Sequence, residues 1–356
     1  GDRNGHSVSI SEDGLIMAVS ARYNDDAGTN RGAVRIYEWD NDDWAQKGST
    51  IFGENDNEYS GDSLSLNAKG DIIAIGAMLN DGNGNDSGHV RIYKWNGSSW
   101  NQMGTEINGE AADDYSGYSV SLSSDGTIVA IGALANKGDN NDTDKGHVRI
   151  YRYVQGLYNN TWVQMGNDID GENEGDKFGN CVSLSNDGYI LAIGAPTNKG
   201  LYLSYLEQYY SNVGQVQIFQ YVQFTNKWVK MADTIYGESN DDQFGESLAL
   251  SKNGSVLVVG AQYSACEEKL TNPQKGRVRV FNLLGSVEPA PQLQSKVTSF
   301  SKIGDDIYGT EDYGRLGGSL AMSADGLTMV ATSINESDGG KGGKFIAYKW
   351  INDNWV

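Results

Sequence analysis

The stretch GYSVSLSSDGTIVAIGA, residues 117–133, recurs six times with small changes along this chain of 356 residues. Each copy has a glycine, a serine or cysteine two residues later, alternating apolar residues, a turn and an apolar run. The copies begin near Gly5, Gly61, Gly117, Gly179, Gly245 and Gly317. A unit that recurs at such spacing is typical of a repeat architecture.

Each copy predicts two antiparallel strands joined by a tight turn. Polar and apolar residues alternate from Ser119 to Ser123, which is the period of a strand with one buried face. The turn, Asp125-Gly126 in this copy, favours a two-residue hairpin in which both central residues have positive φ. The apolar run from Thr127 to Ala133 indicates a second strand that is covered on both faces.

A second module follows each copy after a variable loop. It reads GHVRIYRY at residues 146–153, and its alternating β-branched and aromatic residues predict a third strand. A fourth strand then opens with an aromatic residue such as Trp162. Four antiparallel strands per unit predict an all-β fold, a β-propeller of four-stranded antiparallel blades forming one domain over residues 1–356. Six blades is the direct interpretation, and seven blades, with one trimmed away, is the alternative.

The repeats resemble a known family. Phe178-Gly179 followed by Gly194-Ala195-Pro196 is similar to the FG-GAP repeat of integrin α-subunit-like β-propellers, and Phe244-Gly245 matches in part. This resemblance implies a propeller, usually of seven blades. FG-GAP repeats often carry a calcium loop between their first two strands. That site does not carry over, because a two-residue Asp-Gly turn is too short to wrap an ion with about six to eight oxygen ligands.

The charge balance restricts the partners. The chain has 47 acidic and 27 basic residues, and its net charge is −20. We therefore expect no nucleic acid as a partner and no direct membrane insertion, since nucleic acids and anionic membranes attract cationic surfaces and no transmembrane run is present. The two cysteines, Cys181 and Cys266, do not make a disulfide framework, and whether they pair is left open.

No catalytic motif stands out in the sequence. His89 and His147 share one slot of the third strand, and its variation between repeats indicates a solvated strand face. No zinc spacing or phosphate loop is present. We therefore expect a protein that is not an enzyme. The alternative is a carbohydrate-active or ester-cleaving propeller enzyme whose carboxylate pair is hidden among the many acids.

Acidic residues recur in the loops between strand four and the next blade. Propeller loops of this kind open on one face, and loops held by a rigid scaffold usually carry binding sites. We expect this face to recognise a protein or a glycan. The predicted binding residues are Glu54, Glu110, Glu172, Asp176, Glu238 and Asp242. A structural role for the recurring Gly-Glu acids, as acceptors from backbone N–H groups, is the alternative.

Two further loops are candidates for binding Ca²⁺, the one cofactor that we expect. Residues 80–86 and 139–144 each place several oxygen ligands within a short segment, which suits a hard cation. The predicted ligands are Asp81, Asn83, Asn85, Asp86, Asp139, Asn141, Asp142 and Asp144. Asn, Asp and Gly are also ordinary loop formers, so a plain loop is the alternative.

Six Asn-x-Ser/Thr sequons favour an exported glycoprotein. Their asparagines are Asn85, Asn96, Asn141, Asn159, Asn253 and Asn335. We therefore expect the protein to be extracellular or on the surface of a cell or particle. A subunit of a surface filament or shell, within a larger surface assembly, is the alternative to a separate binding module.

Overall fold

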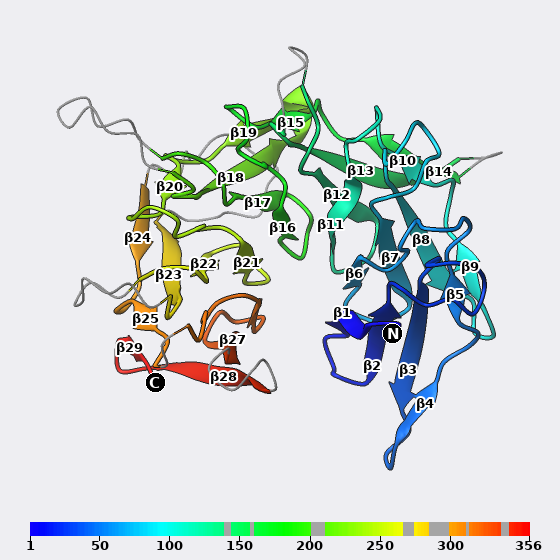
Figure 1. Ribbon diagram of the computed structural model, residues 1–356, viewed down its shortest axis with the longest axis horizontal. Coiled ribbons are helices and arrows are strands. Elements are labelled where there is room, and N and C mark those ends of the chain that lie inside the picture. The colour runs from blue at the N-terminus through cyan, green and yellow to red at the C-terminus, as the bar shows by residue number, and fades with distance from the viewer. Residues whose placement is uncertain are drawn as a thin grey trace. The chain divides into compact units, whose positions relative to one another are not determined.

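The computed structural model describes residues 1–138, 144–156, 160–200, 211–265, 274–284, 299–310, 313–335 and 342–356. The strands form six antiparallel sheets, one for each repeat (Figure 1). The fold class is therefore the predicted one, a β-propeller of six blades. The helix in the described part of the chain is η1 (Gln223–Thr225), and no described helix is long and apolar enough to cross a membrane.

The chain divides into two compact units of three blades, Gly1–Asp170 and Gly171–Val356. The strands of the first unit are β1 (Asn4–Ile10), β2 (Ile16–Ala21), β3 (Ala33–Trp39), β4 (Trp44–Gln46), β5 (Ile51–Phe52), β6 (Ser63–Leu66), β7 (Ile72–Ala77), β8 (His89–Trp95), β9 (Trp100–Gln102), β10 (Ile107–Asn108), β11 (Ser116–Leu122), β12 (Ile128–Ala133), β13 (His147–Gln155), β14 (Asn160–Gln164) and β15 (Ile169–Asp170). Those of the second unit are β16 (Cys181–Leu184), β17 (Ile190–Ala195), β18 (Gln215–Val222), β19 (Lys227–Lys230), β20 (Ile235–Tyr236), β21 (Ser247–Leu250), β22 (Val256–Ala261), β23 (Arg277–Leu284), β24 (Ser299–Lys302), β25 (Ile307–Tyr308), β26 (Leu320–Met322), β27 (Thr328–Asn335), β28 (Gly342–Ile351) and β29 (Asn354–Trp355). The expectation of a single domain over residues 1–356 stays a prediction.

Each blade follows the predicted plan, with a divided fourth strand. In blade 3 the order is β11-β12-β13-β14, and β15 also pairs with β13. The predicted fourth strand is thus two short pieces, β14 and β15, along one edge of the third strand. The same pairing recurs in blades 1, 2, 4 and 5, while blade 6 has four described strands.

The turn between the first two strands differs from the expected two-residue hairpin. Only its glycine has positive φ, +70° at Gly126, whereas Asp125 does not. The Ser123 hydroxyl accepts a hydrogen bond from the Ile128 N–H at 3.0 Å and donates one to Asp125 Oδ1 at 2.7 Å. Because these side chains provide hydrogen-bond partners for backbone N–H groups, a longer loop is stable without positive φ at the aspartate. Equivalent bonds recur at Ser11, Ser185, Ser251 and Ser323.

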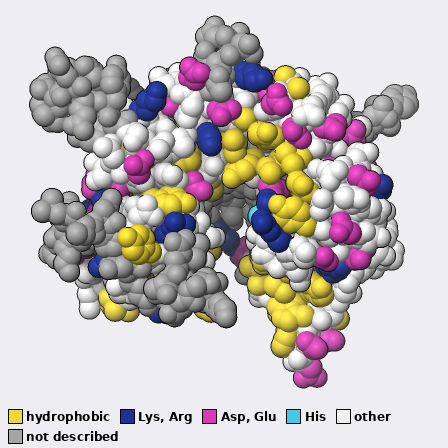
Figure 2. Space-filling model, in the orientation of Figure 1, with side chains coloured by type: hydrophobic (Ala, Val, Ile, Leu, Met, Phe, Trp, Pro, Cys, Tyr) yellow, Lys and Arg dark blue, Asp and Glu magenta, His cyan; other side chains and the backbone are white. Residues whose placement is uncertain are grey.

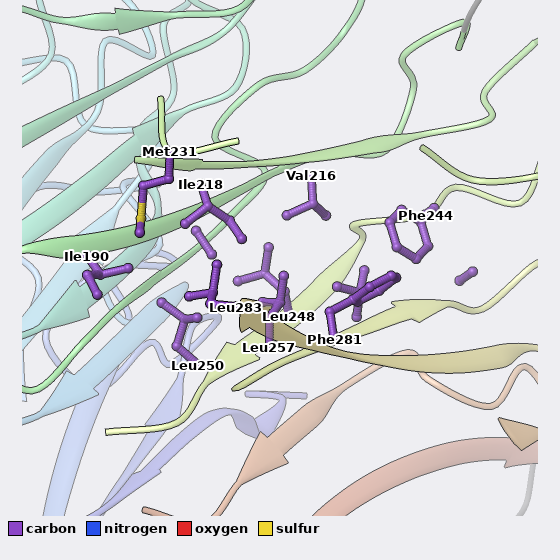
Figure 3. Packing of buried hydrophobic residues seen from close by; sticks show 13 residues of the cluster. Ile190, Val216, Ile218, Met231, Phe244, Leu248, Leu250, Leu257, Phe281 and Leu283 are labelled. Atoms are coloured by element: carbon purple, nitrogen blue, oxygen red, sulfur yellow. The ribbon is translucent and has the colours of Figure 1, made fainter. Parts of the chain in front are cut away.

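The apolar core lies between neighbouring blades within each unit. In the cluster of Figure 3, Ile190 and Ile218 of blade 4 pack with Leu248, Leu250 and Leu257 of blade 5. Burial of one such side chain stabilises the fold by about 1.5–3 kcal/mol. The alternating residues of the first strand and the apolar run of the second strand therefore act together to join blades.

The glycine that ends the second strand allows backbones of adjacent blades to approach. A Cβ atom built on Gly194 would lie 2.1 Å from the carbonyl oxygen of Gly245. Gly260 stands in the same relation to Gly317, also at 2.1 Å. No other residue type fits such a contact without movement of the backbone, which explains the Gly-Ala ending of the repeated stretch.

The third strand is buried on both faces, which contradicts the expected solvated face at His89 and His147. In β13, Val148 and Ile150 are fully buried on one face, and His147 is 1% exposed on the other. His89 of β8 is 2% exposed. The prediction was wrong because it treated the strand as half covered, whereas stacked blades cover both sides. Polar side chains at the first position of the third strand therefore face the connection from the preceding blade.

Candidate functional site

Glu110, His147 and Asp168 come together where blades 2 and 3 meet in the first unit. Glu110 follows β10, His147 is the first residue of β13, and Asp168 directly precedes β15. His147 Nδ1 lies 3.8 Å from Glu110 Oε2 and 4.0 Å from Asp168 Oδ2. One ligand atom from each residue lies within 4.8 Å of the other two, so the three side chains could hold a metal ion.

The backbone of Glu110 is held from two sides. Asn83 Nδ2 donates hydrogen bonds to the carbonyl oxygens of Gly109 and Glu110, at 2.8 and 2.9 Å. The Glu110 N–H donates to Asp114 Oδ2 at 3.2 Å. A Cβ on Gly109 would lie 2.0 Å from the carbonyl oxygen of Ser87, so glycine is required there. These contacts fix where the Glu110 side chain begins.

His147 is a buried, uncharged imidazole. The pKa of His147 is lowered to about 4, first by burial and then by the nearby Arg149 guanidinium, while the charge of Asp168 opposes the shift. Its Nε2 atom is buried without a hydrogen-bond partner in the described part of the chain. A buried polar atom without a partner is costly, and a neutral imidazole is a good metal ligand or proton acceptor.

The two carboxyl groups of the cluster are in contact with each other. Burial raises the pKa of Glu110, Arg149 opposes this, and Asp168 raises it again through its charge and a hydrogen bond between the side chains. Arg149 Nη1 lies 3.4 Å from Glu110 Oε1, and Gln164 donates to Asp168 Oδ1 at 2.5 Å. The negative charge of Asp168 next to Glu110 therefore favours the protonated form of Glu110. The Glu110 and Asp168 side chains are 44% and 30% exposed, so solvent reaches them.

The predicted binding residues fall into two kinds. Glu54, Glu110, Glu172 and Glu238 have side chains that are about half exposed and lie near cationic groups of the same unit. Asp176 and Asp242 are buried and accept hydrogen bonds from backbone N–H groups. The expected structural role thus belongs to the buried acid later in each loop. Acidic side chains are scattered over the face shown in Figure 2.

The predicted calcium loops are only partly described. Asp139, Asn141 and Asp142 lie outside the described residues, and Asp144 is half-buried. In the loop of residues 80–86, Asp81 Oδ1 accepts from the Asp86 N–H at 2.8 Å, and the Asn85 amide donates to Asp86 Oδ2 at 3.0 Å. Internal hydrogen bonds therefore shape this loop. A calcium ion there stays a prediction.

The sequons are partly described as well. Asn85, Asn96 and Asn253 are exposed in loops or turns, and Asn335 is the last residue of β27. Asn141 and Asn159 lie outside the described residues. Glycosylation, a surface location and a protein or glycan partner stay predictions. Cys181 is a free thiol whose pKa burial raises to about 11, and Cys266 also lies outside the described part.

Comparison with known proteins supports the predicted family. The FG-GAP repeat family matches residues 1–37, which cover β1, β2 and most of β3. Together with the six blades, this match supports an FG-GAP β-propeller family. A search of curated proteins finds no match to this chain.

Several solved structures share the propeller fold at low sequence identity. A candidate 6-phosphogluconolactonase from Bacteroides uniformis is 12% identical with a TM-score of 0.59, over 99% of this chain and 83% of that one. A periplasmic gluconolactonase from Pseudomonas aeruginosa is 15% identical with a TM-score of 0.53, over 96% and 84%. Hydrazine synthase from Kuenenia stuttgartiensis is 12% identical with a TM-score of 0.53, over 93% and 76%.

These structures correct one prediction from the sequence. We expected a protein that is not an enzyme, because no catalytic motif stood out. Two of the similar structures are named as lactonases, so a propeller fold without a recognisable motif is no argument against hydrolysis. At this identity the likeness itself shows the fold.

Proposed function

We propose that this propeller hydrolyses carboxylic esters, lactones included, at the cluster of Glu110, His147 and Asp168. The observation that supports the proposal is the contact between two carboxyl groups beside a buried neutral imidazole. Titratable groups perturbed by burial and by one another are typical of catalytic sites. The lactonase names of two structures with the same fold favour an ester bond as the substrate.

The cluster has the groups that ester hydrolysis needs. Glu110 is exposed enough to meet water, and as a carboxylate it can take a proton while the water oxygen attacks the carbonyl carbon. The intermediate then breaks its ester C–O bond, and the departing oxygen takes that proton. Arg149, 3.4 Å from Glu110, places positive charge near the developing oxyanion.

The test is hydrolysis by the full chain of p-nitrophenyl acetate and of a δ-lactone, the latter followed by acid release. We expect turnover by the wild type and a fall in kcat/KM of at least about 100-fold in Glu110→Gln, since general base catalysis contributes about that much. Glu54→Gln changes the same position of the preceding blade and should keep wild-type activity. No turnover by the wild type, or full activity in Glu110→Gln, would refute the proposal.

A further inference from the structure

Three positions of the repeat meet in the same way in successive blades. They are the acid of the Gly-Glu pair, the first residue of the third strand, and the residue that precedes the last short strand. The strand registers His89–Asn108, His147–Asp170, Gln215–Tyr236 and Arg277–Tyr308 are equivalent. The same slot can therefore be compared between blades of one chain, each within its own unit.

Blade 5 shows how the slot is neutralised by the protein itself. The central residue is Arg277, and its Nη1 atom lies 2.7 Å from Glu238 Oε2 and 3.6 Å from Asp306 Oδ2. Arg279 lies 2.7 Å from Glu238 Oε1, and Lys302 adds a third cation, 2.9 Å from Asp306 Oδ1. Two carboxylates here enclose a permanent positive charge, which compensates for their removal from water.

In blade 4 this slot has one acid, so it has less negative charge to neutralise. Its acid Glu172 lies 3.4 Å from Lys230 Nζ, and Thr234 replaces the second acid. Blade 2 carries the same residue types as blade 3, namely Glu54, His89 and Glu106, and Arg91 lies 3.1 Å from Glu54. Its three side chains are not as close together as those of blade 3 in the described part of the chain.

Blade 3 keeps both carboxylates and lacks the central cation. His147 stands where blade 5 has Arg277, and its imidazole is buried. Arg149 approaches Glu110 at 3.4 Å, whereas Asp168 accepts a hydrogen bond from the neutral amide of Gln164. Within the described ranges, this is the one cluster of three His, Cys, Asp or Glu side chains whose possible ligand atoms lie within 4.8 Å of one another. This slot therefore brings two carboxyl groups and one imidazole nitrogen close enough to share an ion.

From this comparison we infer that Glu110, His147 and Asp168 bind one divalent transition-metal ion of the zinc class. One imidazole nitrogen with two carboxylate oxygens suits zinc or cobalt, whereas calcium and magnesium take shells made of oxygen. Two ligands at about 2.1 Å from a tetrahedral ion lie about 3.4 Å apart, so the observed 3.8 and 4.0 Å need only small movements. The exposed edges of Glu110 and Asp168 leave a side for ion entry and a water ligand.

Ion binding is measured independently of the proposed hydrolase activity. The full chain is stripped with a chelator, dialysed and titrated with ZnCl₂ by calorimetry and with CoCl₂ by visible absorption. We expect one zinc ion per chain and cobalt bands typical of a site with nitrogen and oxygen ligands. CaCl₂ should not compete for the same site. No saturable zinc or cobalt binding by the wild type would overturn the inference.

The variants place residues from the equivalent positions of other blades into blade 3. His147→Gln copies blade 4 and should weaken zinc binding at least about 100-fold, since loss of even an outer partner of a metal ligand costs about 10–100-fold. His147→Arg copies blade 5 and should abolish binding while keeping the fold, as checked by circular dichroism. His89→Gln is the matched control in blade 2 and should bind as the wild type does. If either His147 variant misfolds, Asp168→Thr, which also copies blade 4, must show the loss.

The outcomes separate the two proposals. Wild-type zinc affinity in folded His147→Gln, or an equal loss in His89→Gln, would refute this metal site. Zinc binding without any ester hydrolysis would leave the site standing and refute only the hydrolase. Ester hydrolysis by the wild type without any saturable zinc or cobalt binding would leave the hydrolase standing and refute only the metal site.

Discussion

Replacement of His89 tests whether the first residue of the third strand is buried, at a position away from the candidate site. The pKa of His89 is lowered from its ordinary 6.5 to about 4, first by burial and then by Arg91, while Glu58 and Glu106 oppose the shift. Between these two values the unfolded chain binds a proton that the folded protein does not. The folded state is therefore stabilised fully above about pH 6.5 and loses that stability as the pH falls toward 4.

The magnitude follows from the shift. One pKa unit corresponds to about 1.4 kcal/mol, so His89 accounts for a loss of about 3 kcal/mol between pH 6.5 and pH 4. His89→Gln removes the titrating group, and Gln215 shows that a glutamine can be buried in this slot. Urea unfolding at constant ionic strength, from pH 7.5 to 4, measures the unfolding free energy of both proteins.

We expect the two curves to converge or cross as the pH falls, because only the wild type loses the His89 contribution. His147 and the carboxyl groups titrate in both proteins, so their effects cancel in the difference. Parallel curves across this range would show that His89 is accessible to protons in the folded state. That result would refute the argument that stacked blades bury the third strand on both faces.

Three further predictions concern the frame and the loops. Gly194→Ala should lower the unfolding free energy in urea by about 3 kcal/mol or more, because its Cβ would lie 2.1 Å from a backbone oxygen of the next blade. Gly14→Ala, with open space around it but φ of +75°, should cost only about 1 kcal/mol. Ser123→Ala should cost about 1–3 kcal/mol, since it leaves the buried Ile128 N–H without its acceptor; an unchanged urea midpoint would contradict this. If the loop of residues 80–86 binds calcium, the melting temperature should rise with CaCl₂ and fall with chelator, and equal midpoints would rule this site out.

Much of the fold could be predicted because its signals are local. The alternation from Ser119 to Ser123 and the apolar run from Thr127 to Ala133 each lie within one short segment, and six copies repeat them. The FG-GAP resemblance rested on the same segments. The geometry of the turn could not be predicted in this way. Hydrogen bonds of Ser123 and Asp125 stabilise a turn in which the aspartate does not have the expected positive φ.

The candidate site could not be predicted in the same way. Glu110, His147 and Asp168 belong to three separate segments, and none is unusual beside its counterparts in other repeats. A partial signal was present in the register of the three positions, where blades 2 and 3 each combine two acids with a histidine. Because the residue at the His147 position varies between repeats, the sequence predicts a side chain in contact with solvent. In the structure this side chain is 1% exposed.

Local periodicity thus specifies strands, turns and the number of blades, because each depends on neighbours along the chain. Burial of the third strand depends instead on the blade before it, whose loop delivers Glu110 to His147. Only the stacking of blades 2 and 3 turns a polar strand position into a neutral imidazole beside paired carboxyl groups. The perturbed pKa values of His147 and Glu110 arise first from burial, and burial is a property of the packed molecule.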